Sequence, residues 1–135
     1  MKKANILLVD DDEIYIYLTK RLLNDISEEI AVSSFTDGEQ AIDFIKACTS
    51  EKVELPDVIL LDVNMPFLDG WGFLLEFKKL KSKLEDKVHI YLVTSSELDD
   101  DKKRAKDFEE LTGYYVKPIS EKDLIEILEE VYKDI

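Results

Sequence analysis

Four apolar residues in a row, Val58 to Leu61, lead directly to a single carboxylate, Asp62. Two of the four are β-branched, and an unbroken apolar run of this length is typical of a strand buried on both faces of a parallel sheet. Pro66 prevents further strand pairing, and Asp69-Gly70 supplies turn chemistry before the next helix. Open α/β sheets bind their ligands at the carboxyl ends of the strands. Asp62 therefore lies where such a fold carries its chemistry.

Short apolar runs alternate with amphipathic segments along the whole chain. Strands are expected at residues 6–9, 30–35, 58–61, 88–93 and 113–116, each followed by a helix. This alternation predicts an α/β fold: a doubly wound, flavodoxin-like parallel sheet with helices on both faces. No linker or repeat divides the chain, so residues 1–135 are expected to form a single domain.

The expected helices differ in how clearly their ends are marked. Asp12 is a natural N-cap for the first helix, and Thr36 begins a capping box for the second. Ser120 caps the last helix, whose apolar stripe runs to Ile135. The fourth helix is the weakest, and three residues mark its inner face: Leu98, Ala105 and Phe108.

The composition excludes several kinds of partner. The 135 residues include 31 acidic and 18 basic side chains, which give a net charge of −13. Such a surface repels the phosphates of nucleic acids and anionic membranes, and the basic groups at residues 78–83 and 102–104 are short and diluted by acids. No apolar run approaches the roughly 20 residues of a membrane span. We therefore expect a protein that binds neither nucleic acid nor membrane.

The chain has one cysteine, Cys48, and one histidine, His89. A lone cysteine excludes an internal disulfide and suits a reducing compartment, and the acids at residues 10–12 leave the first apolar run too short for a signal sequence. A cytoplasmic protein is expected. Cys48 lies among apolar helix positions and is interpreted as a small buried hydrophobe. His89 is expected in the middle of a strand, where it packs.

Four of the five expected strands end in polar residues that an apolar core would not choose. Asp10 and Asp11 follow the first strand, Asp62 the third, Thr94 the fourth and Lys117 the fifth. The carboxyl ends of parallel strands share one edge of the sheet, so we expect these side chains to meet. With the strand order 2-1-3-4-5, the first and third strands are neighbours, and the crevice between them is the topological switch point.

This set of side chains predicts a metal-assisted phosphoryl site. Three clustered carboxylates repel one another, and a hard divalent cation such as Mg²⁺ relieves the conflict. The Lys117 ammonium and the Thr94 hydroxyl would stabilise an incoming phosphoryl group, and Asp62 is the expected nucleophile. Each residue alone also has an ordinary interpretation as a helix cap, a turn acid or a surface lysine. The hypothesis depends on their convergence at one edge.

Short motifs stand at these strand ends: Val9-Asp10-Asp11, Leu61-Asp62-Val63-Asn64-Met65-Pro66 with Asp69-Gly70, Val93-Thr94-Ser95, and Tyr114-Tyr115-Val116-Lys117-Pro118. In type and order they match the receiver domain of bacterial two-component response regulators, the family of the chemotaxis regulator. The sequence resembles this family over its whole length. The resemblance implies that Asp62 is the phosphoacceptor and that Thr94 and Lys117 contact the phosphoryl group.

The resemblance also implies a magnesium site and a switch. Four residues would form the metal site: Asp11, Asp62 and the backbone carbonyl of Asn64 as ligands, with Asp10 acting largely through a metal-bound water. Tyr114 matches the aromatic switch position of the family, where it would respond to Thr94 and change the surface made by helix 4, strand 5 and helix 5. The Lys117–Pro118 bond is implied to be cis.

Partners follow from the same resemblance. A sensor histidine kinase or a histidine phosphotransfer protein would supply the phosphoryl group, and a protein target would read the switched surface. No output domain follows residue 135, so we expect a stand-alone receiver, a monomer or a weak phosphorylation-dependent homodimer. Such a domain catalyses only its own phosphoryl transfer and dephosphorylation and is not expected to be an enzyme.

Two other function classes fit parts of the sequence. A phosphatase of the haloacid dehalogenase type would use the Asp-x-Asp of residues 10–12, with Asp10 as nucleophile, but no acidic pair ends a strand after Lys117 and no cap domain is present. A flavodoxin-like cofactor module would need hydroxyls and amides in its first loop, where residues 10–13 are acids that repel phosphate. Labelling at Asp10 or flavin colour would favour these alternatives.

Overall fold

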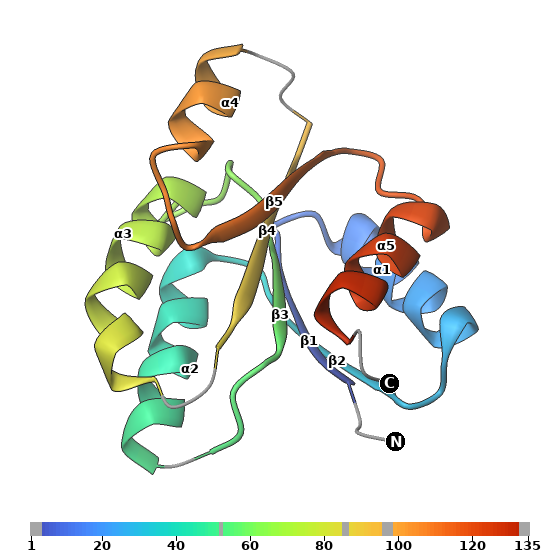
Figure 1. Cartoon of the computed structure of the whole chain (residues 1–135), viewed down its shortest axis with the longest axis horizontal. Helices are drawn as coiled ribbons and strands as arrows, with labels where there is room; N and C mark the ends of the chain where they lie inside the picture. The colour runs from blue at the N-terminus through green and yellow to red at the C-terminus, as the bar shows by residue number, and fades with distance from the viewer. Residues whose placement is uncertain (1–3, 52, 85–86, 96–98, 133–135) are drawn as a thin grey trace.

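A parallel sheet of five strands lies between helices on both of its faces (Figure 1). This computed structural model describes residues 4–51, 53–84, 87–95 and 99–132. The strands are β1 Ala4–Val9, β2 Ile30–Phe35, β3 Val58–Leu61, β4 His89–Thr94 and β5 Leu111–Val116. All pairs are parallel, and the order is β2-β1-β3-β4-β5. The predicted doubly wound fold and its strand order are confirmed.

The helices follow the strands in the expected alternation. They are α1 Glu13–Ile26, α2 Gly38–Glu51, α3 Gly70–Leu80 with a 3₁₀ turn at Lys81–Lys83, α4 Asp99–Ala105 and α5 Glu121–Val131. Figure 1 shows α1 and α5 together on one face of the sheet, with α2, α3 and α4 on the other. None of the described helices is long and apolar enough to cross a membrane.

The apolar runs of the central strands build a core on both faces of the sheet. Leu7 and Ile59 are fully buried in the cluster under α2 and α3, whereas their neighbours Leu8 and Leu60 pack toward α1 and α5. Adjacent residues of a strand point to opposite faces, so strands covered on both sides are apolar at every position. Cys48 is buried in the first cluster, as expected.

Side-chain caps fix the starts of the helices. Asp12 accepts hydrogen bonds from two backbone N–H groups at the start of α1 (3.0 and 3.1 Å), and Ser120 forms a reciprocal capping box with Asp123 in α5. Both caps agree with the sequence prediction. At α2 the cap is Asp37, whose carboxylate accepts the N–H three residues on at 2.7 Å. The prediction of Thr36 is wrong, because a carboxylate is the stronger acceptor at a helix N-terminus.

Two further expectations are corrected by the structure. His89 is the first residue of β4, so its half-buried ring lies at the amino-terminal edge of the sheet. Phe108 lies beyond the end of α4, where its ring stacks on Trp71 at a centroid distance of 5.7 Å. An aromatic residue at helical spacing can thus pack from the turn that follows a helix. The expected stripe positions Leu98 and Ile135 lie outside the described residues.

Loss of the Ser120 cap should destabilise the fold by a small amount. Ser120→Ala removes the acceptor of the Asp123 N–H, and N-cap losses cost about 1 kcal/mol. Urea denaturation followed by circular dichroism should show this decrease in the free energy of unfolding. Ser82→Ala, at an exposed site in the 3₁₀ turn, is the matched control and should change it by less than about 0.5 kcal/mol. Equal losses in both variants would contradict the cap's contribution.

Candidate functional site

Backbone hydrogen bonds continue the sheet one residue beyond β1, β3 and β5. The N–H of Asp10 donates to β2 at 3.1 Å, that of Asp62 to β1 at 2.9 Å, and that of Lys117 to the carbonyl of Thr94 at 2.8 Å. The side chains predicted from the strand ends therefore start from a fixed backbone at one edge of the sheet. The structure brings them together as the sequence analysis expected.

Three carboxylates form a cluster at this edge. One oxygen from each of Asp10, Asp11 and Asp62 lies within 4.8 Å of the others. Asp10 and Asp62 are only 2% and 6% exposed, whereas Asp11 is exposed and lies on the solvent side. Carboxylate oxygens at this spacing are the ligands that hard divalent cations prefer. The cluster is therefore consistent with a divalent-metal site.

Lys117 reaches between the two buried carboxylates. Its Nζ lies 2.6 Å from Oδ2 of Asp10 and 3.7 Å from Oδ2 of Asp62. The other oxygen of each carboxylate accepts a backbone N–H at 2.9 Å, from Asp12 and Val63 respectively. One oxygen of each carboxylate is thus held by the backbone, and the other faces the ammonium.

One lysine does not neutralise this cluster. Burial raises the pKa of Asp62 from an ordinary 3.8 to about 6, and the neighbouring charge of Asp10 adds to the rise. Burial also raises the pKa of Asp10, although its hydrogen bond with Lys117 opposes this. Both carboxylates are destabilised in their charged form, so additional positive charge at the site would be favourable.

The loop between β3 and α3 is held closely against its surroundings. The N–H of Gly70 donates to the carbonyl of Val63 at 2.8 Å, which closes the loop. A Cβ at Gly70 would lie 2.5 Å from the carbonyl oxygen of Asp62, and a Cβ at Gly38, in α2, would overlap the carbonyl oxygen of Leu68. Two close backbone contacts thus fix the loop that follows Asp62.

The remaining predicted residues lie at the end of β4, within β5 and in the loop after β3. Thr94 is fully buried at the end of β4, and Tyr114 is partly buried in β5 against the core under α2 and α3. Asn64 follows Asp62 by two residues and is exposed. The Lys117–Pro118 bond is cis, as the family resemblance implied.

Sequence reasoning missed one neighbour of the site, Tyr15. Tyr15 lies in the first turn of α1, and its ring centroid is 4.3 Å from Nζ of Lys117. Helical periodicity indicates which face of a helix turns inward. It does not indicate which side chain from another element will reach that face, so no sequence signal connected these two residues.

A comparison with protein families matches residues 6–129 to the family described as the response regulator receiver domain. The chain belongs to this receiver domain family. Receiver domains are phosphoacceptor signalling domains of two-component systems rather than ordinary enzymes. The membership decides against the phosphatase and the flavodoxin-like module that the sequence had left as alternatives.

Relatives and solved structures agree with this assignment. The receiver domain is 29% identical over 126 residues to the probable methanogenesis regulatory protein FilR2 of Methanothrix harundinacea, covering 93% of this chain and 79% of that protein. A two-component response regulator from Cytophaga hutchinsonii matches with a TM-score of 0.86 and 25% identity, over 99% of this chain and 100% of that one. The receiver domain of a sensor histidine kinase from Pseudomonas aeruginosa PAO1 matches with a TM-score of 0.74 and 25% identity, over 94% and 96% of the two chains. That structure has a magnesium ion coordinated in its active-site cleft.

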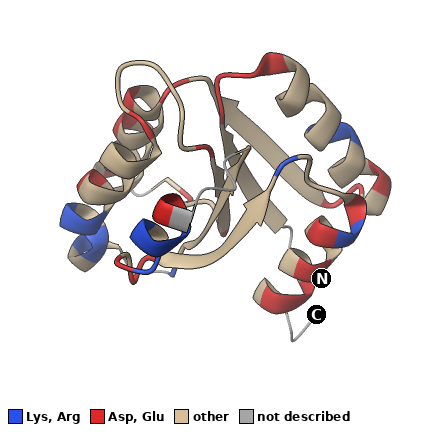
Figure 2. Cartoon of the chain, turned by 90° about the horizontal axis from the view of Figure 1, so that it is seen from above, with Lys and Arg blue, Asp and Glu red and all other residues tan. Residues whose placement is uncertain are grey.

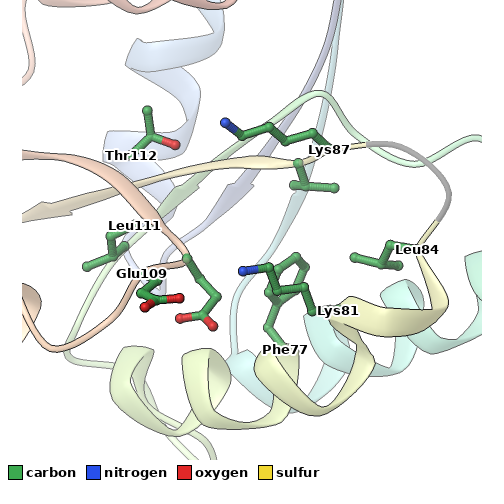
Figure 3. Close-up of a pocket in the computed structure, with 9 residues that line it drawn as sticks. Phe77, Lys81, Leu84, Lys87, Glu109, Leu111 and Thr112 are labelled. Atoms are coloured by element: carbon green, nitrogen blue, oxygen red, sulfur yellow. The ribbon is translucent and has the colours of Figure 1, made fainter.

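A separate hollow lies at the opposite, amino-terminal edge of the sheet (Figure 3). It encloses about 380 Å³ between the end of α3 and the start of β5. Figure 3 shows Lys81 and Glu109 facing the hollow from opposite sides, and Lys87 extending toward Thr112. None of the sequence-predicted site residues lines this hollow. The site residues predicted from the strand ends therefore lie away from this hollow.

The raised pKa of Asp62 predicts a pH-dependent effect of Asp62→Asn on stability without metal. The pKa of the Asp62 carboxyl is near 6 in the folded state and 3.8 in the unfolded state, so ionisation of Asp62 lowers the free energy of unfolding. This loss is nearly complete once the pH is well above 6, and it becomes smaller as the pH falls toward 3.8. The stability gained by Asp62→Asn should therefore be about 1.4 kcal/mol larger at pH 8 than at pH 5. Urea denaturation in EDTA at both pH values measures this difference. A gain that stays constant, or that grows toward acid pH, would be the contrary result.

Proposed function

We propose that this receiver domain accepts a phosphoryl group on Asp62 from a sensor histidine kinase or a histidine phosphotransfer protein, in the presence of Mg²⁺. The observation that carries the proposal is the position of the Asp62 carboxylate. It follows β3 beside the carboxylates of Asp10 and Asp11, 3.7 Å from the Lys117 ammonium. A nucleophile surrounded by potential metal ligands and a cation suits phosphoryl transfer, which requires mainly positioning and charge stabilisation.

The chemistry requires an ionised nucleophile and stabilised phosphoryl oxygens. With a pKa of about 6, Asp62 is mostly ionised at neutral pH, and one of its oxygens attacks the phosphorus of a donor phosphohistidine. The P–N bond breaks as the O–P bond forms, and the electron pair leaves with the imidazole. Lys117 and the Thr94 hydroxyl would hold the oxygens of the transferred group.

The same edge would hold the metal ion. Asp11, Asp62 and the backbone carbonyl of Asn64 would be its ligands, with Asp10 acting indirectly. Two observations support the fit: the oxygen-only donor set, and the raised pKa values of the two buried carboxylates, which call for positive charge. When bound, the ion supplies that charge beside the phosphoryl group.

Exposed apolar side chains near the site support a protein as the donor. Ile14, Tyr17 and Leu18 occupy one exposed face of α1, the helix that begins just after the acidic cluster, and are 74%, 56% and 54% exposed. Phe67, in the loop after Asp62, is 86% exposed. Apolar side chains gathered on a polar surface mark protein interaction sites. We propose that the phosphate donor docks on them.

Phosphorylation would be transmitted by Thr94 and Tyr114. Phosphoryl oxygens on Asp62 would draw the Thr94 hydroxyl toward the site, and the Tyr114 ring would turn inward into the space that it leaves. The surface of α4, β5 and α5 would change as a result. The composition of α4 supports such a change, because a helix of only seven residues with few apolar side chains is weakly held against the core.

A protein, rather than a nucleic acid, is the proposed target of this surface. The net charge is −13, and Figure 2 shows acidic residues on helices at both sides of the sheet. We propose that residues 1–135 act as one receiver domain, as a monomer or a weak phosphorylation-dependent homodimer.

Acetyl phosphate with Mg²⁺ should phosphorylate Asp62. Intact mass spectrometry should show one added phosphoryl group, EDTA should prevent it, and Asp62→Asn should abolish it because the proposed nucleophile is lost. Asp12→Asn is the matched control: it changes a neighbouring acid but retains a side chain that caps α1, so it should still be phosphorylated. Phosphorylation that survives in Asp62→Asn would refute the assignment.

Beryllofluoride, a phosphoryl mimic, should change the distant surface as well as the site. Amide chemical shifts should move across residues 99–117 and in α5, and Thr94→Ala should suppress those distant changes while leaving the shifts next to Asp62. Heteronuclear NMR measures both variants in the same buffer with Mg²⁺. Changes confined to the carboxylate cluster in the wild type would mean that this switch does not operate.

A further inference from the structure

The Lys117 ammonium has a third neighbour besides the two carboxylates. The ring of Tyr15 covers it, with 4.3 Å between Nζ and the ring centroid, and an ammonium within about 6 Å of an aromatic face is attracted by the ring. The Lys117 side chain is 18% exposed, so the contact is largely screened from water. The lysine is thus held between Asp10, Asp62 and an aromatic face.

We propose that Tyr15 is a positioning residue for Lys117 and that its ring keeps the ammonium within reach of the phosphoryl group on Asp62. This inference rests on the proposed phosphorylation of Asp62. A lysine side chain has several rotatable bonds and loses considerable conformational entropy when it is fixed. A ring on the remaining side of the ammonium favours positions between the two carboxylates over positions in solvent.

The ring, and not the hydroxyl, is assigned this role. Tyr15 packs with the core residues between the sheet and α1, which fixes the orientation of the ring. Its hydroxyl oxygen is buried, and its polar neighbour is the Thr19 hydroxyl of the same helix, with which it forms no well-aligned hydrogen bond. Tyr15→Phe should therefore preserve both the fold and the position of Lys117, whereas Tyr15→Leu removes the aromatic face and keeps an apolar side chain.

The position of Lys117 should affect phosphate and metal in opposite ways. Its Nζ is already 2.6 Å from Asp10, and a shift toward Asp62, now 3.7 Å away, would bring it to a phosphoryl group. An ammonium beside the carboxylates also opposes a cation there. Loss of the ring should slow phosphoryl transfer and leave Mg²⁺ affinity unchanged or raised. General damage to the site would lower both.

The test compares Tyr15→Leu and Tyr15→Phe with Tyr132→Leu, which makes the same change at a partly buried tyrosine that hydrogen-bonds Asp57 at the opposite edge of the sheet. The small donor acetyl phosphate removes any effect of protein docking. At saturating Mg²⁺, Tyr15→Leu should be phosphorylated roughly 3- to 30-fold more slowly, the factor that corresponds to a cation–π contact. Tyr15→Phe and Tyr132→Leu should keep the wild-type rate, and calorimetric Mg²⁺ titration should show no loss of affinity in any of them.

A spectroscopic measurement tests the contact without phosphorylation. The ring face should shift the ε-methylene proton resonances of Lys117 upfield in the wild type and in Tyr15→Phe, and this shift should vanish in Tyr15→Leu. A wild-type rate in Tyr15→Leu, a slow Tyr15→Phe, or a parallel loss of Mg²⁺ affinity would overturn the proposal. A wild type that takes no phosphate on Asp62 would instead refute the proposed function, and the NMR shift would still decide whether Tyr15 holds Lys117.

Discussion

Repulsion between buried carboxylates is the constraint on which this structure depends. Val9 and Leu61 are paired across β1 and β3, so the residues that follow them, Asp10 and Asp62, must lie side by side. The register that buries the apolar runs on both faces is the register that brings the two charges together. A shift by one residue would turn every apolar side chain to the other face. Separating the two acids would therefore require the side chains on both faces of the sheet to repack.

The positive charge that partly compensates them comes from farther away. Neighbouring strands are about 4.8 Å apart, and β5 is two strands from β3 and three from β1. Lys117 therefore has to extend across the end of β4 to reach the carboxylates. The residue there is Thr94, which is small and buried, so the lysine can pass over it. A long side chain in this arrangement needs lateral support, and Tyr15 is placed to provide it.

The sequence could predict the features at which an apolar run ends abruptly in a charged residue. Apolar runs end at Asp10, Asp62 and Lys117, and these ends locate the site once the strands are assumed parallel. The strand order needed a further premise, since periodicity alone does not say which strands are neighbours. Errors arose where two neighbouring residues suit one role, and where a residue beyond the end of a helix keeps the spacing of its inner face. Thr36 and Asp37 are both good caps, and Phe108 has the spacing of a helix face although it lies in a turn. The contact between Tyr15 and Lys117 depends on tertiary packing and has no local signature.

The two glycines that contact the loop after Asp62 affect how mutational data on this protein would be interpreted. Neither Gly38 nor Gly70 carries a group that could bind metal or phosphate, yet a side chain at either position would collide with the backbone of that loop. In a saturation screen for signalling, both positions would be as intolerant as the acids themselves. A site outlined from such a screen would extend into α2 and α3. The additional positions would be intolerant because a side chain there collides with the loop, and not because they take part in the chemistry.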